Sequence, residues 1–153
     1  MCKLIILMGP ASCGKTYLSQ YISHDVQTIY TGKDEEIEEL LHLCENFNTV
    51  LLESSHLSIP RNRRDFFQRV KFPRDTEIIG VWVDARLSTI LSQNQSRIVP
   101  VNEEVLRDQF KFRVSPKSVE PFNKRVFVVR EPGLGISSTS PTIKPIIDVL
   151  SEI

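Results

Sequence analysis

Five short apolar runs alternate with amphipathic or polar segments along the chain. The runs cover residues 4–8, 26–30, 49–53, 77–84 and 125–129, and they carry mainly Val, Ile, Leu and aromatic side chains. Between them, apolar side chains recur three or four positions apart, which is the spacing of a helix with one buried face. Strands that alternate with helices in this way predict an α/β fold, in which helices cover both faces of a parallel sheet.

The helical segments can be placed from the same spacing and from their end signals. Acidic residues open the segments that begin near residues 34 and 103, where the helix dipole stabilises negative charge, and Asn102 is a suitable N-cap for the second of these. We expect the polar run 92–101 to form a short lid and the Pro-, Gly- and Ser-rich residues 131–142 to form a loop. The expected helices are 17–22, 34–44, 61–70, 87–91, 103–110 and 143–150.

The first apolar run leads into Gly-Pro-Ala-Ser-Cys-Gly-Lys-Thr, residues 9–16, which fits the pattern G-x-x-x-x-G-K-[ST]. A strand, such a loop and a helix together direct backbone N–H groups at an anionic phosphate chain. Lys15 would reach the β- and γ-phosphates, and the Thr16 hydroxyl would ligate Mg²⁺. The alternative is that the glycines only turn the chain. The nucleotide-binding residues expected are Gly9, Pro10, Ala11, Ser12, Cys13, Gly14, Lys15, Thr16 and Tyr17.

This order of strand, loop and helix is typical of the three-layer sandwich of the P-loop NTPases. We therefore expect a five-stranded parallel sheet in the order 2-3-1-4-5. A chain of 153 residues with 41% hydrophobic content is enough for one core, and we expect a single domain over residues 1–153. Ligands of such a sheet bind beyond the carboxyl ends of the strands, so the polar residues there are the candidates for chemistry.

Three of these candidates suit phosphoryl transfer, and each has a plain structural alternative. Asp34 follows the second apolar run and could take or orient the proton of an acceptor hydroxyl, but an acid at a helix start is often only an N-cap. Glu53 closes the third run and could support Mg²⁺, although many strands end in solvated acids. Arg97 lies in the polar run and would close over the transferred phosphoryl group; the alternative is a solvated arginine.

Further candidates concern the acceptor. His56 follows Glu53 closely and could contact substrate, or it could only hydrogen-bond within its loop. The segment 61–70 is rich in arginine, and Arg61 and Arg64 could bind an anionic acceptor. A charged run of this kind is otherwise a solvated helix face.

Net charge and cysteine content restrict the partners and the compartment. The chain has 19 basic and 19 acidic residues, so no overall positive field attracts nucleic acid or membrane. The three cysteines lack metal-ligand spacing, and their odd number favours free thiols in a reducing compartment. The first apolar run is too short for a signal peptide or a membrane span. We expect a cytoplasmic protein with no membrane partner, and the oligomeric state is left open.

Four segments resemble the P-loop kinases of the polynucleotide 5′-hydroxyl kinase type. Tyr-Thr-Gly-Lys-Asp at 30–34 is similar to that family's basic residue followed by the general-base Asp. Residues 53–64 resemble its acid, small hydroxyl and Pro-x-Arg-Arg segment. Residues 94–107 resemble its lid arginine, Val-Pro and following helix, and residues 115–123 are similar to its Pro and Glu-Gly-Phe-Asp stretch.

The resemblance implies an ATP- and Mg²⁺-dependent kinase. Asp34 would be its general base, with Lys33 next to it at the acceptor, and the acceptor would be the 5′-hydroxyl of a polynucleotide or nucleotide. The chain departs from the family at Gln93, where a second lid arginine is usual, and at the acidic turn 35–38, where a phosphate-binding Arg is usual. Two alternatives therefore stay open: a kinase for a small molecule such as a sugar or nucleoside, and a nucleotide-binding regulatory protein without phosphotransfer.

Overall fold

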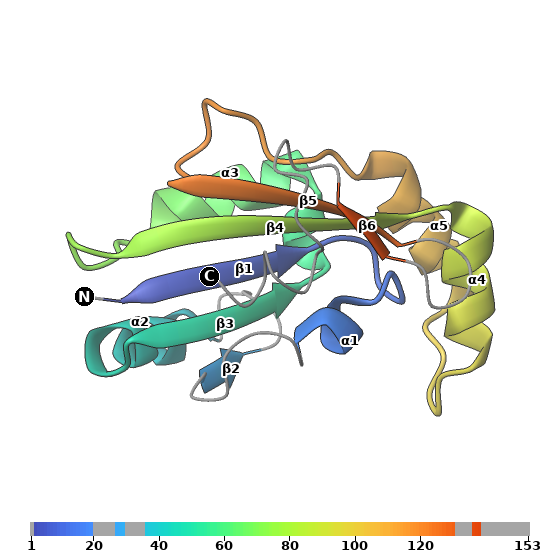
Figure 1. Ribbon diagram of the computed structural model, residues 1–153, viewed down its shortest axis with the longest axis horizontal. Coiled ribbons are helices and arrows are strands. Elements are labelled where there is room, and N and C mark those ends of the chain that lie inside the picture. Colours follow the sequence, from blue (N-terminus) through green and yellow to red (C-terminus); the bar gives the residue numbers. More distant parts are fainter. Residues whose placement is uncertain (1, 20–26, 30–35, 131–135, 139–153) are drawn as a thin grey trace.

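A central β-sheet organises the molecule. The computed structural model describes residues 2–19, 27–29, 36–130 and 136–138, and the structural statements below concern these residues. The sheet has six strands in the order β2-β3-β1-β4-β5-β6 (Figure 1). The strands are β1 (Lys3–Met8), β2 (Gln27–Ile29), β3 (Thr49–Ser54), β4 (Glu77–Ala85), β5 (Lys124–Arg130) and β6 (Ile136–Ser138).

The first five strands in chain order are parallel, and they lie in the order 2-3-1-4-5. The expected number of strands is wrong, because β6 adds a sixth and antiparallel member at the edge beside β5. This strand lies within residues 131–142, which we expected to form a loop throughout. Only three residues of β6 pair with β5, from Ile136 opposite Arg130 to Ser138 opposite Val128, so the run is too short to stand out in its Pro-, Gly- and Ser-rich surroundings.

Helices cover both faces of the sheet. One buried cluster includes Leu18, Ile90 and Leu106, and the other includes Leu40 and Phe66. The first three side chains come from α1 (Lys15–Ser19), α4 (Leu87–Gln95) and α5 (Glu103–Phe112), and the last two come from α2 (Ile37–Asn46) and α3 (Pro60–Arg69). A short 3₁₀ helix, η2 (His56–Ser58), connects β3 to α3. The three-layer arrangement expected from the sequence is present.

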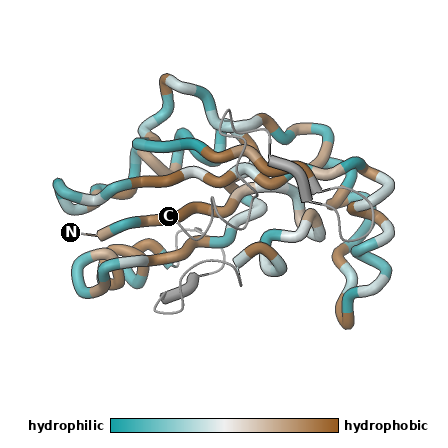
Figure 2. Tube along the Cα trace, in the orientation of Figure 1, coloured by the Kyte–Doolittle hydropathy of each residue, from teal (hydrophilic) through white to brown (hydrophobic). Residues whose placement is uncertain are grey.

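The central strand β1 supplies both cores. Leu4, Ile6 and Met8 belong to one cluster, whereas Ile5 and Leu7 belong to the other, as the alternation of side chains along a strand requires. All five are fully buried. A strand buried on both faces has no polar positions, which is why this run is continuously apolar. Figure 2 shows the hydrophobic residues concentrated along the middle strands.

Two helix predictions can be compared with the structure in detail. The side chain of Asn102 accepts hydrogen bonds from the backbone of Glu104 (2.9 Å) and Val105 (3.4 Å), so its expected role as N-cap of α5 is confirmed. Helix α4, however, continues to Gln95 instead of ending at residue 91, and the first four residues of the expected lid, 92–95, are therefore helical. The expected helix 143–150 lies outside the described residues. Within the described part, no helix combines the length and the apolar content that crossing a bilayer would need.

Candidate phosphate-binding site

The loop between β1 and α1 has a backbone that few residues could adopt. Gly9, Ser12 and Gly14 have φ angles of 150°, 64° and 105°, in the region that side chains disfavour. A Cβ added to Gly9 would lie 2.1 Å from the backbone oxygen of Val83, in β4, and 2.8 Å from Sγ of Cys13. The first glycine of the motif is therefore required both by its backbone angles and by the close approach of the neighbouring strand.

Lys15 is the cation of this loop. Its side chain is largely buried, with 9% of the residue exposed, and Nζ donates hydrogen bonds to the backbone oxygens of Gly9 (2.9 Å) and Pro10 (2.8 Å). Nζ also donates to Oγ of Ser55 at 3.1 Å, just after β3. The ammonium group thus lies across the loop at the carboxyl ends of β1 and β3, where anionic phosphates would be attracted to it.

Thr16 and Glu53 form the second polar element of the site. Thr16 Oγ1 donates a hydrogen bond of 3.0 Å to Oε2 of Glu53, which is buried near the end of β3. Hydroxyl and carboxylate oxygens are the ligand types that Mg²⁺ prefers. No group of three or more His, Cys, Asp or Glu side chains suited to a metal occurs among the described residues. A magnesium ion here would therefore take its remaining ligands from water and phosphate, as Mg²⁺ commonly does.

These groups surround a pocket of about 630 Å³. Most of the nucleotide-binding residues expected from the motif face it, together with five residues from the end of β3, the position after it, the last part of α4 and the turn that follows α4. Gly9, Pro10 and Cys13 are buried and are not among the residues that line the pocket. The described residues that line the pocket are Ala11, Ser12, Gly14, Lys15, Thr16, Tyr17, Glu53, Ser55, Gln93, Arg97 and Val101.

The Cys13 thiol is poorly placed for reaction. It is fully buried, and burial raises its pKa, against an opposing effect of the Lys15 charge. Since the thiolate is the reactive form, this cysteine is expected to be inert in the folded protein.

Arg97, the arginine of the polar run, is among the residues that line this pocket, and its closure over a transferred phosphoryl group stays a prediction. Its Nη1 donates a hydrogen bond of 3.2 Å to Oγ of Ser12 in the phosphate loop. Two residues that sequence reasoning missed also contact the loop: Asn94 accepts from Ser12, and Gln109 accepts from the backbone N–H of Ala11 at 2.8 Å. No local signal marks Gln109, because its partner lies 98 positions away in the chain.

The candidates for acceptor binding do not join the pocket. His56 lies in η2 and is not among the described residues that line it. Arg61 and Arg64 are exposed on α3 and line a separate hollow of about 350 Å³ with Asn62, Asp65 and Gln68. Lys33 and Asp34 lie outside the described residues, so their predicted roles stay predictions.

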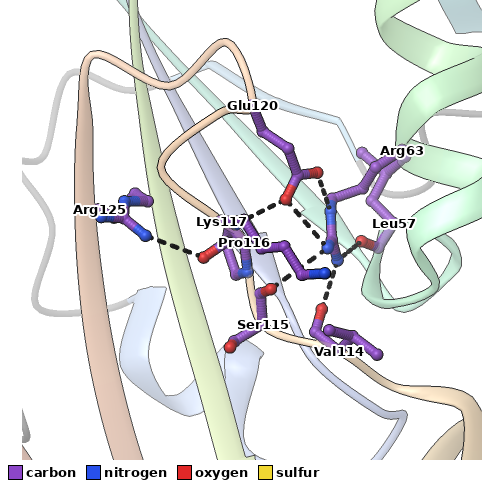
Figure 3. A network of polar contacts seen from close by, with 8 residues as sticks. All are labelled: Leu57, Arg63, Val114, Ser115, Pro116, Lys117, Glu120 and Arg125. Atoms are coloured by element: carbon purple, nitrogen blue, oxygen red, sulfur yellow. Dashed lines mark hydrogen bonds and ion pairs between the residues drawn. The ribbon is translucent and has the colours of Figure 1, made fainter.

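The arginine between these two, Arg63, has a structural role (Figure 3). It is 1% exposed and forms an ion pair with Glu120 at 2.8 Å. Its Nη1 donates to the backbone oxygens of Leu57 (3.0 Å) and Val114 (2.7 Å). In this arginine-rich segment, Arg61 and Arg64 are therefore solvated, whereas Arg63 is buried. The contacts of Arg63 fix the chain after α5 against η2.

Another strand-end acid, Asp84 of β4, is also engaged. Its carboxylate accepts from Nε of Arg113 at 2.8 Å and from Nη2 at 3.4 Å, and the guanidinium of Arg113 lies 3.6 Å from the centre of the Phe110 ring. This pair connects the residue that follows α5 to the end of β4.

Comparison with known proteins identifies the fold. No protein-family model matches the chain, and no curated protein does. A sugar kinase from Janibacter sp. HTCC2649 superposes with a TM-score of 0.62 at 12% identity, over 98% of this chain and 91% of that one. A gluconokinase from Sinorhizobium meliloti 1021 gives 0.56 at 13% identity, over 97% and 87%. A chain of the Pnkp1/Rnl/Hen1 RNA repair complex gives 0.54 at 13% identity, over 80% and 50%. At these identities the likeness shows the fold alone, which this chain shares with the kinases named here.

Proposed function

We propose that this chain is an ATP-dependent kinase that transfers the γ-phosphate to an acceptor hydroxyl. The observation that carries the proposal is the hydrogen bond between Thr16 and Glu53 inside the pocket that Lys15 also lines. The loop motif supplies the backbone N–H groups, the lysine and the hydroxyl of Thr16. The carboxylate of Glu53, which comes from another strand and contacts that hydroxyl, adds the acidic ligand type that a metal-bound triphosphate requires.

Each residue has a defined part in this proposal. Lys15 binds the phosphate chain, and Thr16 and Glu53 hold the metal, Thr16 through its hydroxyl and Glu53 through the carboxylate beside it. Mg²⁺, when bound, supplies the charge that offsets the phosphate oxygens. Arg97 adds a second positive group at the rim, and an arginine in this role contributes about 10³- to 10⁵-fold in rate. Asp34 receives or orients the acceptor proton, a role that rests on the sequence.

The leading acceptor is the 5′-hydroxyl of a polynucleotide or nucleotide, which rests on the resemblance of the four segments named above. A small sugar-like acceptor is the second candidate. Two observations favour it: the exposed arginines of α3 line a hollow separate from the phosphate pocket, and two of the similar structures are named a sugar kinase and a gluconokinase.

A transfer assay tests the proposal directly. The full chain is incubated with Mg²⁺ and γ-labelled ATP, and three acceptor classes are offered at equal hydroxyl concentration: 5′-hydroxyl DNA and RNA oligonucleotides, nucleosides, and sugars with gluconate. We expect label in one class only. Oligonucleotides that already carry a 5′-phosphate control for transfer to other hydroxyls.

Two variants separate catalysis from binding. We expect Asp34→Asn to abolish transfer while ATP binding stays within about twofold, because the carboxylate would act on the acceptor and not on the nucleotide. Lys15→Ala should weaken ATP binding itself. Tight ATP binding by the wild type without label in any acceptor class would instead indicate a nucleotide-binding protein without phosphotransfer, and unchanged transfer by Asp34→Asn would remove this residue from the mechanism.

A further inference from the structure

Asn94, near the end of α4, lies in a polar segment of the sequence, yet its side chain is buried and hydrogen-bonded. It is only 6% exposed. Its Nδ2 donates to the backbone oxygen of Val101 at 2.8 Å, and its Oδ1 accepts from the backbone N–H of the same residue at 2.9 Å. The amide therefore pairs with both backbone polar groups of Val101 and closes the turn that runs from residue 94 to residue 101.

This double contact fixes which end of the amide faces the phosphate loop. If the oxygen and nitrogen were exchanged, the amide N–H₂ would face the Val101 N–H, and two donors would oppose each other. The oxygen must therefore point toward Val101 N, and the same oxygen is 3.2 Å from Oγ of Ser12. Since this oxygen can only accept, the Ser12 hydroxyl is obliged to donate its proton to Asn94.

The direction of that hydrogen bond determines which further hydrogen bonds the Ser12 hydroxyl can form. With its proton directed at Asn94, the hydroxyl of Ser12 offers lone pairs to another donor, and Nη1 of Arg97 donates to it at 3.2 Å. Ser12 itself has a φ of 64°, an uncommon backbone angle for a residue with a side chain. The contacts thus run in one direction, from Arg97 to Ser12 to Asn94, and Asn94 is held by Val101.

A second contact fixes the same two parts of the molecule to each other. The backbone N–H of Ala11, next to Ser12, donates to Oε1 of Gln109 on α5. The phosphate loop is thereby attached to α4 through Asn94 and to α5 through Gln109. The turn that carries Arg97 lies between these two helices, so it begins and ends on elements that are themselves attached to the loop.

We propose that Asn94 is a positioning residue for Arg97. By closing the turn 94–101 and orienting the Ser12 hydroxyl, it holds the guanidinium at the rim of the phosphate pocket before a nucleotide binds. The proposal rests on the proposed function only in taking the ligand of this pocket to be a nucleoside triphosphate with its metal. Asn94 does not touch that ligand in this account; it acts through Arg97.

A double-mutant cycle on nucleotide affinity tests this inference. The affinity of the full chain for Mg²⁺ with the non-hydrolysable analogue AMP-PNP is measured by titration calorimetry for the wild type, Asn94→Ala, Arg97→Ala and the double variant. We expect Asn94→Ala to weaken binding about three- to tenfold in the wild-type background, the size expected for the loss of one typical hydrogen bond. In the Arg97→Ala background, the same change should weaken binding less than twofold.

Asn123→Ala is the matched control. The side chain of Asn123 also hydrogen-bonds a distant backbone group, since its Oδ1 accepts from Ile78 N at 2.7 Å, while the backbone N–H of Asn123 donates to Ile78 O at 2.8 Å. This pair lies at the start of β4, at the opposite end of the sheet from the pocket. Thermal unfolding should show both Asn variants less stable than the wild type, but only Asn94→Ala should change the affinity.

The outcomes distinguish this proposal from the proposed function. Equal weakening by Asn94→Ala in both backgrounds, or an Arg97→Ala variant with wild-type affinity, overturns the positioning role while ATP binding stands. A wild type that binds no analogue overturns both. If Asn94→Ala does not fold, Ser12→Ala removes the intermediate hydroxyl without opening the turn, and its cycle with Arg97→Ala must show the same loss of additivity.

Discussion

Gly9 is the residue where the phosphate loop comes closest to the rest of the sheet. A methyl group there would meet the backbone oxygen of Val83 at 2.1 Å, and a backbone atom of a central strand cannot move away as the end of a flexible side chain can. We expect Gly9→Ala to lower the free energy of unfolding by about 2–4 kcal/mol, the range for overpacking at a strained backbone position. Urea unfolding measures this loss.

Gly80→Ala is the comparison for this prediction. Its added methyl would lie 2.8 Å from the ring of Phe122, a side chain that can shift, and its φ is not in the disfavoured region. The loss should therefore be smaller than for Gly9→Ala. A larger loss at Gly80 would mean that the strand beside Gly9 can yield.

Cys44 and Cys2 are buried free thiols that lie against each other. Burial raises the pKa of Cys44 to about 12, and the neighbouring Cys2 adds to the rise. The folded state then keeps a proton that the unfolded chain loses at an ordinary thiol pKa of about 8.5. The contribution of this group to stability is complete below that pH and is lost as the pH rises toward 12.

We therefore expect the free energy of unfolding to fall between pH 8.5 and pH 10.5, and to fall less steeply in Cys44→Ala. Guanidinium unfolding at a series of pH values measures both slopes. Cys44→Ala should be less stable at every pH because of the lost packing, so the comparison uses the slopes alone. Equal slopes in the two proteins would show that Cys44 does not titrate differently on folding.

For single residues, the sequence indicated site candidates only where those residues lie close together along the chain. Gly9, Lys15 and Thr16 lie within one short segment, and their spacing was enough to make them candidates. Asn94 and Gln109 contact the same loop from 82 and 98 positions away, and no periodicity connects such distant residues. Glu53 lies beside Thr16 because the end of a strand next to β1 has to lie near the loop that follows β1, and its role at Mg²⁺ stays a prediction.

Among the elements, α3 shows how a charged segment can be divided between surface and core. Arg63 donates to Glu120 and to three backbone oxygens, at Leu57, Val114 and Ser115. We expect Arg63→Ala to lower the free energy of unfolding by about 3 kcal/mol, because it leaves these acceptors without a partner. Chemical denaturation measures the change.

A double variant measures how much of that loss comes from leaving the Glu120 carboxylate without its cation. Combining Arg63→Met with Glu120→Gln removes both charges and fills part of the space, so it should recover about 1 kcal/mol or more relative to Arg63→Ala. Arg61→Ala, on the exposed side of the same helix, should change stability by less than about 0.5 kcal/mol. A large loss at Arg61 would mean that the solvated arginines also support the fold.

The predicted end of helix α4, at residue 91, was wrong for a physical reason. Residues 92–95 have little apolar character, and we expected them to leave the helix. They stay helical because Asn94 is turned toward the phosphate loop and hydrogen-bonded there, which replaces the apolar contact that a helix face usually provides. A polar residue that acts as a core residue cannot be recognised from its type.

For the whole molecule, the parallel strands could be ordered from the sequence because apolar runs, crossovers and the loop motif all restrict the same topology. The antiparallel β6 could not be foreseen, since three residues with two serines carry almost no periodic signal. The acceptor could not be derived either. It depends on Lys33 and Asp34, outside the described residues, and on exposed arginines whose hollow is separate from the phosphate pocket.

Nucleotide binding should be visible in the stability of the whole domain. A ligand that binds only the folded state stabilises it by about 2.7 kcal/mol at a concentration one hundred times its Kd. For a domain of this size that corresponds to a rise in Tm of about 5–10 °C. We expect this rise for AMP-PNP with Mg²⁺ in a thermal unfolding experiment, and a clearly smaller rise when Mg²⁺ is replaced by EDTA.

Glu53→Gln tests whether the metal part of this effect comes from the site described. The amide oxygen of Gln can still accept the hydrogen bond from Thr16, so the loop should keep its shape, but the negative charge that favours a cation is lost. The variant should therefore unfold near the wild-type temperature without ligand, and its rise in Tm should no longer depend on Mg²⁺. A variant that keeps the full Mg²⁺ dependence would show that the metal is held without the Glu53 charge, and the pairing of Thr16 with Glu53 would then be a feature of the fold alone.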